Sequence, residues 1–98
     1  MVEKEQVTEV LKKVYDPEIQ FDIYSLGLIY DVEIDGSKVI VTMTLTTPSC
    51  PYGDALMADV KRQVEELEGV EIAVIELTFS PLWSPEKMTE EARIALGM

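Results

Sequence analysis

Residues 28–46 read LIYDVEIDGSKVIVTMTLT, and this stretch decides the fold. In its first half, apolar residues alternate with Asp and Glu, which is typical of a strand with one buried face. Asp35-Gly36 is a strong signal for a tight hairpin turn, which Ser37 and Lys38 either close or lengthen. Alternation resumes from Val39 to Thr46. The stretch therefore predicts an antiparallel hairpin.

Each strand of this hairpin is expected to turn one set of apolar side chains to the core. The two sets are Leu28, Tyr30, Val32 and Ile34 in the first strand, and Val39, Val41, Met43 and Leu45 in the second. The opposite face carries Ile29 and Ile40 among threonines and acids, joined by Ile72 and Val74 from further along the chain. That face is too apolar to be left fully in water, so it is a candidate interface for a homodimer or a partner.

Helical patterns lie on both sides of the hairpin. Upstream, one apolar stripe at helical spacing predicts an amphipathic helix that ends at Asp16-Pro17, because a proline disfavours helical geometry in the residue before it. Downstream, a second stripe predicts a helix from roughly Pro51 to Glu68, with Gly69 in its C-terminal left-handed position. The stripe residues are Val7, Val10, Leu11 and Val14, then Leu56, Met57, Val60, Val64 and Leu67.

The rest of the chain predicts a third strand from Val70 to Phe79 and a short final helix between Thr89, as N-cap, and Gly97. Ala73, Ile75, Leu77 and Phe79 are the expected core face of that strand. The order α-β-β-α-β-α predicts a single α+β domain over residues 1–98, a two-layer sandwich with helices on one face of a small mixed sheet. A right-handed helical crossover makes the second and third strands parallel, and the pattern leaves open which strand is central.

Composition excludes several classes of function. The chain has 98 residues, 8 basic and 19 acidic, for a net charge of -11, so its field repels nucleic acid and anionic lipid. It has no histidine, which excludes a Cys–His dyad, a Ser–His–Asp triad and a His-ligated zinc. It has one cysteine and neither an N-terminal apolar signal nor a membrane span, so we expect it in the cytoplasm.

The single cysteine lies in TTPSCPYGD, residues 46–54, where the second strand gives way to a helix. Pro51 at the first helical position would put Cys50 at or beside the N-cap, where unpaired N–H groups and the helix dipole favour the thiolate. Such a cysteine is a candidate metal ligand or nucleophile. The alternative is a structural cysteine, and the like charge of Asp54 opposes thiolate formation.

Four other residues are candidates for the same pocket. Thr46 and Thr47 end the strand that leads to Cys50, although threonines also suit a half-exposed sheet face. Asp16 and Glu18 lie in the loop after the first helix, where ordinary turn chemistry would equally explain them. We expect the Asp16–Ile19 loop to meet this strand end and helix start at one edge of the domain. Trp83 is expected to be a hydrophobic plug.

Four segments in order resemble a known family: DPEI at 16–19, YSLGLIYDVEI at 24–34, VTMTLTTPSCP at 41–51 and LTFSPLWSPEKM at 77–88. The chain is similar to the MIP-eighteen-like proteins, whose relatives include SufT-type and PaaD-type proteins of iron–sulfur cluster metabolism. The resemblance implies the fold of iron–sulfur cluster assembly domains, in agreement with the predicted order. It also implies a pocket that gathers Asp16, Glu18, Thr46, Thr47 and Cys50.

The resemblance implies an accessory or carrier protein for cytosolic iron–sulfur cluster assembly, with assembly factors and client apoproteins as partners and Cys50 as the cluster or metal ligand. A cluster usually takes four protein ligands, so one cysteine per chain implies a transient cluster completed from elsewhere. PaaD-type proteins add a cysteine-rich C-terminal extension, whereas this chain stops at Met98. We therefore favour a general maturation role over an accessory of a phenylacetate-type oxygenase.

Two further alternatives come from other classes of function. In a cysteine enzyme, Cys50 would be the nucleophile and Glu18 or Asp16 the base, but without histidine it lacks an ordinary proton shuttle near neutral pH. In a pure interaction module, the acidic surface and the apolar sheet face would bind partners, and Cys50 would be dispensable. We expect no enzyme.

Overall fold

The fold was analysed in a computed structural model, which describes residues 2–16, 19–46 and 53–97. Its elements, in chain order, are α1 (Lys4–Leu11), β1 (Ile29–Asp35), β2 (Lys38–Met43), α2 (Gly53–Glu65), β3 (Ile72–Leu77), a 3-10 helix η1 (Pro85–Lys87) and α3 (Glu90–Leu96). The predicted order is confirmed, with η1 added between β3 and α3.

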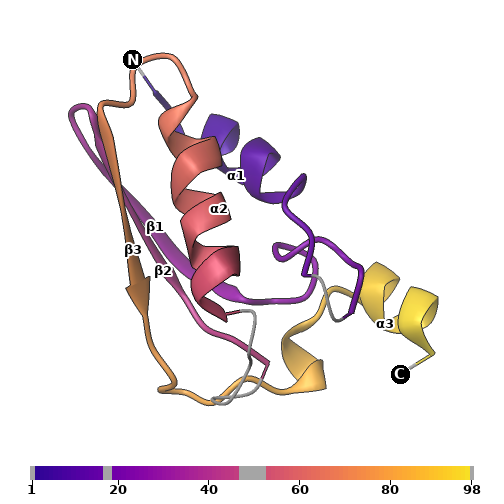
Figure 1. The fold of residues 1–98 in the computed structure, drawn as a ribbon. Helices are drawn as coiled ribbons and strands as arrows, with labels where there is room; N and C mark the ends of the chain where they lie inside the picture. The colour runs from indigo at the N-terminus through magenta and orange to yellow at the C-terminus, as the bar shows by residue number, and fades with distance from the viewer. Residues whose placement is uncertain (1, 17–18, 47–52, 98) are drawn as a thin grey trace.

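The three strands form one sheet in the order β1-β2-β3, so β2 is central (Figure 1). β1 and β2 are antiparallel, and Asp35 pairs with Lys38 across a two-residue turn of Gly36 and Ser37. The turn therefore takes the shorter of the two forms expected from the sequence. β2 and β3 are parallel, as the right-handed crossover predicts.

The core lies between the sheet and the two longer helices, which cover one face of the sheet (Figure 1). α1 buries Val7 and Leu11, and α2 buries Leu56, Val60 and Val64. From the sheet and its flanks the core receives Leu28, Val39, Val41, Met43, Leu45 and Ala73, all at most 4% exposed. α3 lies at one end of the sheet rather than over it (Figure 1).

Several predicted boundaries are wrong, among them those of β3, which spans Ile72–Leu77 rather than Val70–Phe79. α1 ends at Leu11 rather than at Asp16-Pro17, because the chain turns and pairs with residues 21–23: the Ile23 N–H donates to the Val14 carbonyl over 2.9 Å. β2 ends at Met43 rather than Thr46, because Thr44 and Leu45 are both buried and strict alternation stops there. α2 ends at Glu65, three residues before the predicted end, and Gly69 has the expected positive φ of 93°.

The predicted core face of β3 is right only in its first part. Ala73 is 1% exposed and Ile75 packs against the core, but Leu77 is 41% exposed. β3 is an edge strand. Its residues Ile72–Ile75 line a surface hollow together with residues of α2, and Leu77, the last residue of the strand, is not part of that lining. Phe79 follows and is partly buried against the core.

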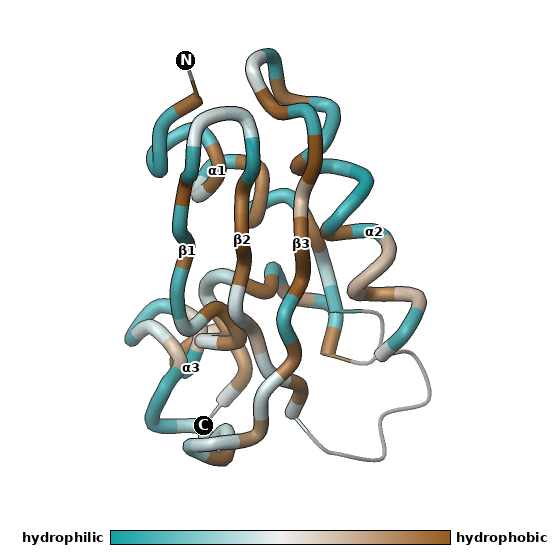
Figure 2. Tube along the Cα trace, turned by 90° about the vertical axis from the view of Figure 1, so that its left-hand side faces the viewer, coloured by the Kyte–Doolittle hydropathy of each residue, from teal (hydrophilic) through white to brown (hydrophobic). Residues whose placement is uncertain are grey.

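The sheet face opposite the helices is open, and Figure 2 looks at it directly. Its register aligns Asp35 with Lys38 and Ile72, Glu33 with Ile40 and Val74, and Asp31 with Thr42 and Glu76. We call these nine residues the open sheet face. Ile29, which was predicted to belong to it, does not: a register shift before Asp31 sets Ile29 opposite Met43, and Ile29 packs against the core. The same shift leaves Tyr30 without a partner on β2, so its predicted core position is wrong.

The outer edge of β3 is protected by α2 at one residue. The Lys61 ammonium donates to the Ala73 carbonyl over 2.9 Å, and the Ala73 N–H donates to the Glu65 carboxylate over 3.0 Å. Lys61 and Glu65 are themselves paired at 2.6 Å. Side chains thus take the place of a neighbouring strand, which blunts an edge that could otherwise pair with another chain. The Lys61 ammonium, followed by the Ala73 N–H, holds the pKa of Glu65 below its ordinary value.

The last helix follows the sequence rules for caps. The Thr89 hydroxyl accepts from the Ala92 N–H over 3.1 Å, and Gly97 is left-handed with a φ of 74°. Both predictions for α3 are therefore confirmed. Among the helices in the described part of the chain, none is both long and apolar enough to cross a membrane.

Candidate functional site

Two of the five candidate residues, Asp16 and Thr46, are among the described residues. The chain after α1 descends toward the end at which β2 finishes and α2 begins (Figure 1). Asp16 follows α1, and Thr46 follows β2. Glu18, Thr47 and Cys50 lie outside the described residues, so the predicted convergence of all five stays a prediction.

Asp16 is a buried carboxylate that organises its own loop. It is 1% exposed, and its Oδ1 accepts from the Ile19 N–H over 3.2 Å. Its backbone N–H donates to the Phe21 carbonyl, and the Gln20 N–H donates to the Asp16 carbonyl, over 3.0 and 2.7 Å. The turn role considered for Asp16 is thus real. Its burial goes beyond turn chemistry, since aspartate is rarely buried unless it is paired.

The end of β2 is held from both sides. The Thr44 N–H donates to the Leu28 carbonyl over 2.8 Å, and the Thr78 N–H donates to the Met43 carbonyl over 2.9 Å. Thr44 is 0% exposed, a position that the sequence pattern assigned to the open face. Thr46, two residues on, is partly exposed. Thr46 is therefore partly exposed and follows a strand end that is held by hydrogen bonds on both sides.

The start of α2 is packed directly onto the end of β2. A Cβ at Gly53 would lie 2.6 Å from Leu45 Cδ1, so a larger residue there would require the Leu45 side chain to shift. Leu45 is 4% exposed and belongs to the core. The two flanks of the segment that carries Cys50 are therefore in contact, and Cys50 precedes α2 by three positions.

A second network ties the loop before β1 to the segment after β3, at the same end of the sheet. Trp83 Nε1 donates to the Leu26 carbonyl and the Tyr30 hydroxyl donates to the Pro81 carbonyl, each over 2.7 Å. The Thr89 N–H donates to the Ser25 carbonyl over 2.9 Å. The Lys87 ammonium lies 5.2 Å from the centre of the Tyr30 ring.

The stretches YSLGLIY and PLWSPEKM belong to two of the segments that carry the family resemblance. The Trp83 and Tyr30 hydrogen bonds of this network join these two stretches to each other. Trp83 packs against the core as predicted, and it also donates a hydrogen bond that the sequence did not reveal. Gly27 has a φ of 78°, and a Cβ there would lie 2.1 Å from the Lys87 carbonyl oxygen. The signals available in the sequence were the glycine in YSLGLIY and the prolines in PLWSPEKM.

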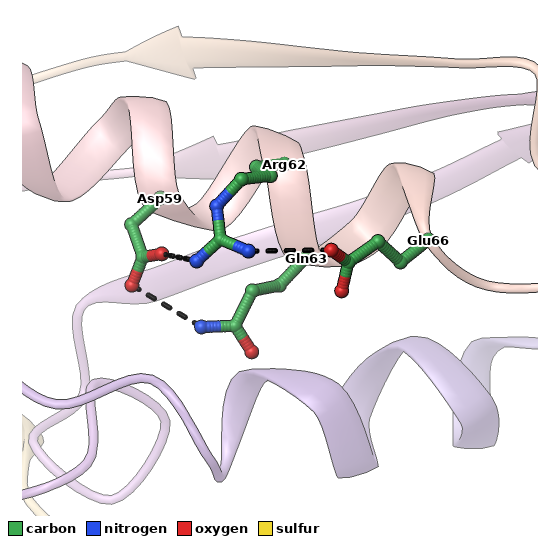
Figure 3. Close-up of polar contacts among 4 residues, drawn as sticks. All are labelled: Asp59, Arg62, Gln63 and Glu66. Atoms are coloured by element: carbon green, nitrogen blue, oxygen red, sulfur yellow. Dashed lines mark hydrogen bonds and ion pairs between the residues drawn. The ribbon is translucent and has the colours of Figure 1, made fainter.

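Asp59 in α2 and Glu66 just after it are paired with neighbouring side chains and are not site candidates. Asp59 accepts from Arg62 and from Gln63, and Arg62 also donates to Glu66 (Figure 3). The hydrogen bond to Asp59, before any other cause, raises the pKa of Arg62. These contacts follow the i,i+3 and i,i+4 spacing of an exposed helix face.

Neither cavity size nor clustered ligands mark a metal site among residues 2–16, 19–46 and 53–97. A hollow of about 590 Å³ in this part lies along α1 and Tyr24 and includes neither Asp16 nor Thr46. No group of three or more Cys, Asp or Glu side chains able to hold a metal occurs among these described residues.

The chain matches known proteins over nearly its whole length. It is 48% identical to a protein of Porphyromonas gingivalis named as an Fe-S protein maturation auxiliary factor, over 96% of this chain and 90% of that protein. It is 38% identical to an iron-sulfur cluster carrier protein of Synechocystis, over 80% of this chain but 22% of that longer protein.

Structural similarity agrees. The crystal structure of a domain of unknown function, DUF59, from Bacillus anthracis superposes with a TM-score of 0.92 at 35% identity, covering 97% of this chain and 92% of that one. Residues 4–77 match the family model described as iron-sulfur cluster assembly protein, a span that includes α1, the hairpin, α2 and β3. The chain therefore belongs to the iron–sulfur cluster assembly protein family.

Proposed function

We propose that this protein is an accessory or carrier in cytosolic iron–sulfur cluster assembly, and that it holds a cluster transiently through Cys50 and passes it to client proteins. The observation that carries this proposal is the family match over residues 4–77, which includes Asp16, Thr46 and Cys50. The names of the relatives, an auxiliary factor and a cluster carrier, support a role without catalysis.

The geometry adds a physical reason for placing the cargo at this end of the domain. Leu45 and Gly53, which flank the Cys50 segment, are in contact, so the thiol is attached to two fixed elements. A thiolate beside the N-terminus of α2 is stabilised by the helix dipole. Asp16 contributes a buried carboxylate from the loop after α1. We infer that Asp16, Glu18, Thr46 and Thr47 form one pocket with Cys50.

The ligand count determines how such a cluster is held. Iron–sulfur clusters usually take four protein ligands, mostly thiolates, and one chain supplies one thiolate. The remaining ligands come from a second chain, from the client, from small thiols, or from Asp16 and Glu18 as oxygen ligands. An incompletely ligated cluster is held weakly, which suits transfer better than storage.

Anaerobic reconstitution with ferrous iron and sulfide tests the proposal. We expect cluster absorbance below one cluster per chain in the unaltered protein, and none in Cys50→Ala. Ser37→Ala is the matched control, because it removes one side-chain heteroatom at the hairpin turn, far from the site. Native mass spectrometry then reports whether the cluster joins two chains. Equal cluster content in Cys50→Ala and the unaltered chain would refute Cys50 ligation.

Asp16→Asn separates the two roles of Asp16. An amide keeps an oxygen that accepts from the Ile19 N–H, so the loop is retained while the negative charge is lost. If Asp16 belongs to the cluster pocket, we expect lower cluster content with a nearly unchanged unfolding midpoint. Unchanged cluster content would assign Asp16 to the turn alone.

A deletion strain tests the role in cells. We expect reduced activity of iron–sulfur enzymes under iron limitation, unaltered activity of enzymes without clusters, and no rescue by Cys50→Ala. Full rescue by Cys50→Ala would favour an interaction module in which the thiol is dispensable. Normal iron–sulfur enzyme activity in the deletion strain would reject the maturation role.

A further inference from the structure

The open sheet face combines an apolar centre with an acidic border. Ile40 and Val74 are neighbours across β2 and β3, and Ile72 is 47% exposed on the same face. None of the three is among the residues that pack against the core. Ile40 and Val74 are partly exposed, and aliphatic side chains gathered on β2 and β3, with no helix over these strands in Figure 2, mark an interaction surface.

The border is a row of carboxylates on β1. Asp31, Glu33 and Asp35 are all exposed and point to this face, because they pair with Thr42, Ile40 and Lys38. Within the described ranges, none of these three carboxylates forms an ion pair or a side-chain hydrogen bond. Lys38, opposite Asp35, is the one cation among the nine residues of the open sheet face, so the face stays net negative beside its apolar centre. Such a surface is complementary to a cationic, partly apolar partner.

A second copy of this chain fits the face poorly. In a twofold dimer the same patch meets itself, so each acidic row approaches a surface that is also acidic. The net charge of -11 adds a general repulsion between two copies. A partner with positive charge turns the same groups into attractions.

The spacing of the charges indicates the shape of the partner. Successive carboxylates on β1 are two residues apart, which is about 7 Å along a strand. Residues four apart on an α-helix are separated by about 6 Å along its axis. A helix with basic residues at i, i+4 and i+8 therefore nearly matches the row. On the opposite face of this sheet, the helices α1 and α2 already pack against the strands (Figure 1).

We propose that the open sheet face binds a basic amphipathic helix of a partner protein, with its apolar stripe on Ile40, Ile72 and Val74 and its Lys or Arg flank along β1. The nine residues of the open sheet face include none of the five candidate pocket residues. The proposal does not require cluster binding, so it and the proposed function can fail separately.

The probe is an amidated 18-residue helical peptide with leucines along one stripe and arginines at i, i+4 and i+8 on its flank. Two control peptides replace the arginines by glutamates or the leucines by serines. Binding to the full chain is followed by amide chemical shifts. We expect the shifts to gather on the open sheet face, affinity to fall with rising salt, and both control peptides to bind at least tenfold more weakly.

Variants of the chain test each half of the surface. Asp31→Asn with Glu33→Gln, and separately Ile40→Thr, should each weaken binding about fivefold. The control, Glu5→Gln with Glu9→Gln, removes the same charge from α1, behind the sheet in Figure 2, and should change affinity less than twofold. Circular dichroism confirms that each variant is folded, and Val74→Thr replaces Ile40→Thr if that variant is not.

Three outcomes would overturn the proposal. Shifts gathered on α1 or α3 would place the binding elsewhere. Equal weakening by the control variant would show attraction to net charge alone. A dimer in sedimentation that Ile40→Thr dissociates would show that a second copy occupies the face.

Discussion

The two ends of this small sheet are built in different ways. At the hairpin end, the chain turns through Gly36 and Ser37, and exposed side chains of α2 protect the edge of β3 at Ala73. The two Ala73 hydrogen bonds join residues 8 and 12 positions apart. At the opposite end, Trp83 reaches Leu26, 57 residues away, and β2 is held from both sides.

This difference separates two kinds of stability. The hairpin end uses turn conformation and solvent-exposed ion pairs, which are individually weak. The opposite end uses buried or half-buried hydrogen bonds and close backbone packing between distant segments, which are costly to disturb. Asp16, the buried candidate residue, belongs to the second kind of environment, where small displacements are resisted.

The largest expected effect contrasts two glycines with positive φ. Gly27→Ala should destabilise the chain by about 3 kcal/mol or more, because a left-handed φ of 78° is combined with a 2.1 Å approach to the Lys87 carbonyl oxygen. Gly36→Ala is the control: its φ is 62° but nothing lies within 4 Å of a Cβ there, so about 1 kcal/mol is expected. Urea denaturation measures both. Equal losses of stability in the two variants would contradict the distinction between the two ends of the sheet.

An intermediate effect is expected at Trp83. Trp83→Phe keeps an aromatic ring but leaves the Leu26 carbonyl without its 2.7 Å donor, for a loss of about 1–2 kcal/mol. Tyr30→Phe removes an exposed hydrogen bond of the same length to Pro81 and should cost less, about 0.5 kcal/mol. Thermal or urea unfolding compares them. A larger loss of stability in Tyr30→Phe than in Trp83→Phe would contradict the larger contribution assigned to the half-buried hydrogen bond between Trp83 and Leu26.

The smallest effect is expected at the hairpin end and depends on pH. The folded-state pKa of Glu65 is lowered from 4.5, so its contribution to stability is present above that value and is lost as the pH falls through the lower folded value. Glu65→Gln should therefore be less stable than the unaltered chain at pH 7, and the difference should shrink toward pH 3. Its exposure keeps the effect small.

Glu66→Gln is the matched control for this measurement, since Glu66 pairs with Arg62 on the same helix and makes no contact with the β3 backbone. The control should show a weaker dependence on pH. A difference between Glu65→Gln and the unaltered chain that is as large at pH 3 as at pH 7 would show that charge is not the cause.

Local rules predicted much of the fold. The hairpin turn, the caps of α3 and the order of elements follow from residues within a few positions of one another. The predictions failed where pairing with another segment competes with local pattern: α1 stops at Leu11 because residues 14–16 pair with 21–23, and Thr44 is buried where its N–H donates to Leu28. The bulge that moves Ile29 to the core is another such case.

The candidate site shows the same division. Sequence identified Asp16, Glu18, Thr46, Thr47 and Cys50 as candidates through residue type and the family resemblance. It did not reveal the burial of Asp16, the contact of Gly53 with Leu45, or the Trp83 hydrogen bond, because each depends on a partner distant in the chain or in another element.

The sequence by itself determined the order of helices and strands, the strong negative charge and the limit of one thiolate per chain, because these follow from local conformation and from counting residues. Only the tertiary structure decided that β2 is central, which face of the sheet stays open, and which loops meet at the end that carries the site. Those features depend on which surfaces exclude water together, and that requires residues far apart in the chain to be packed at the same place.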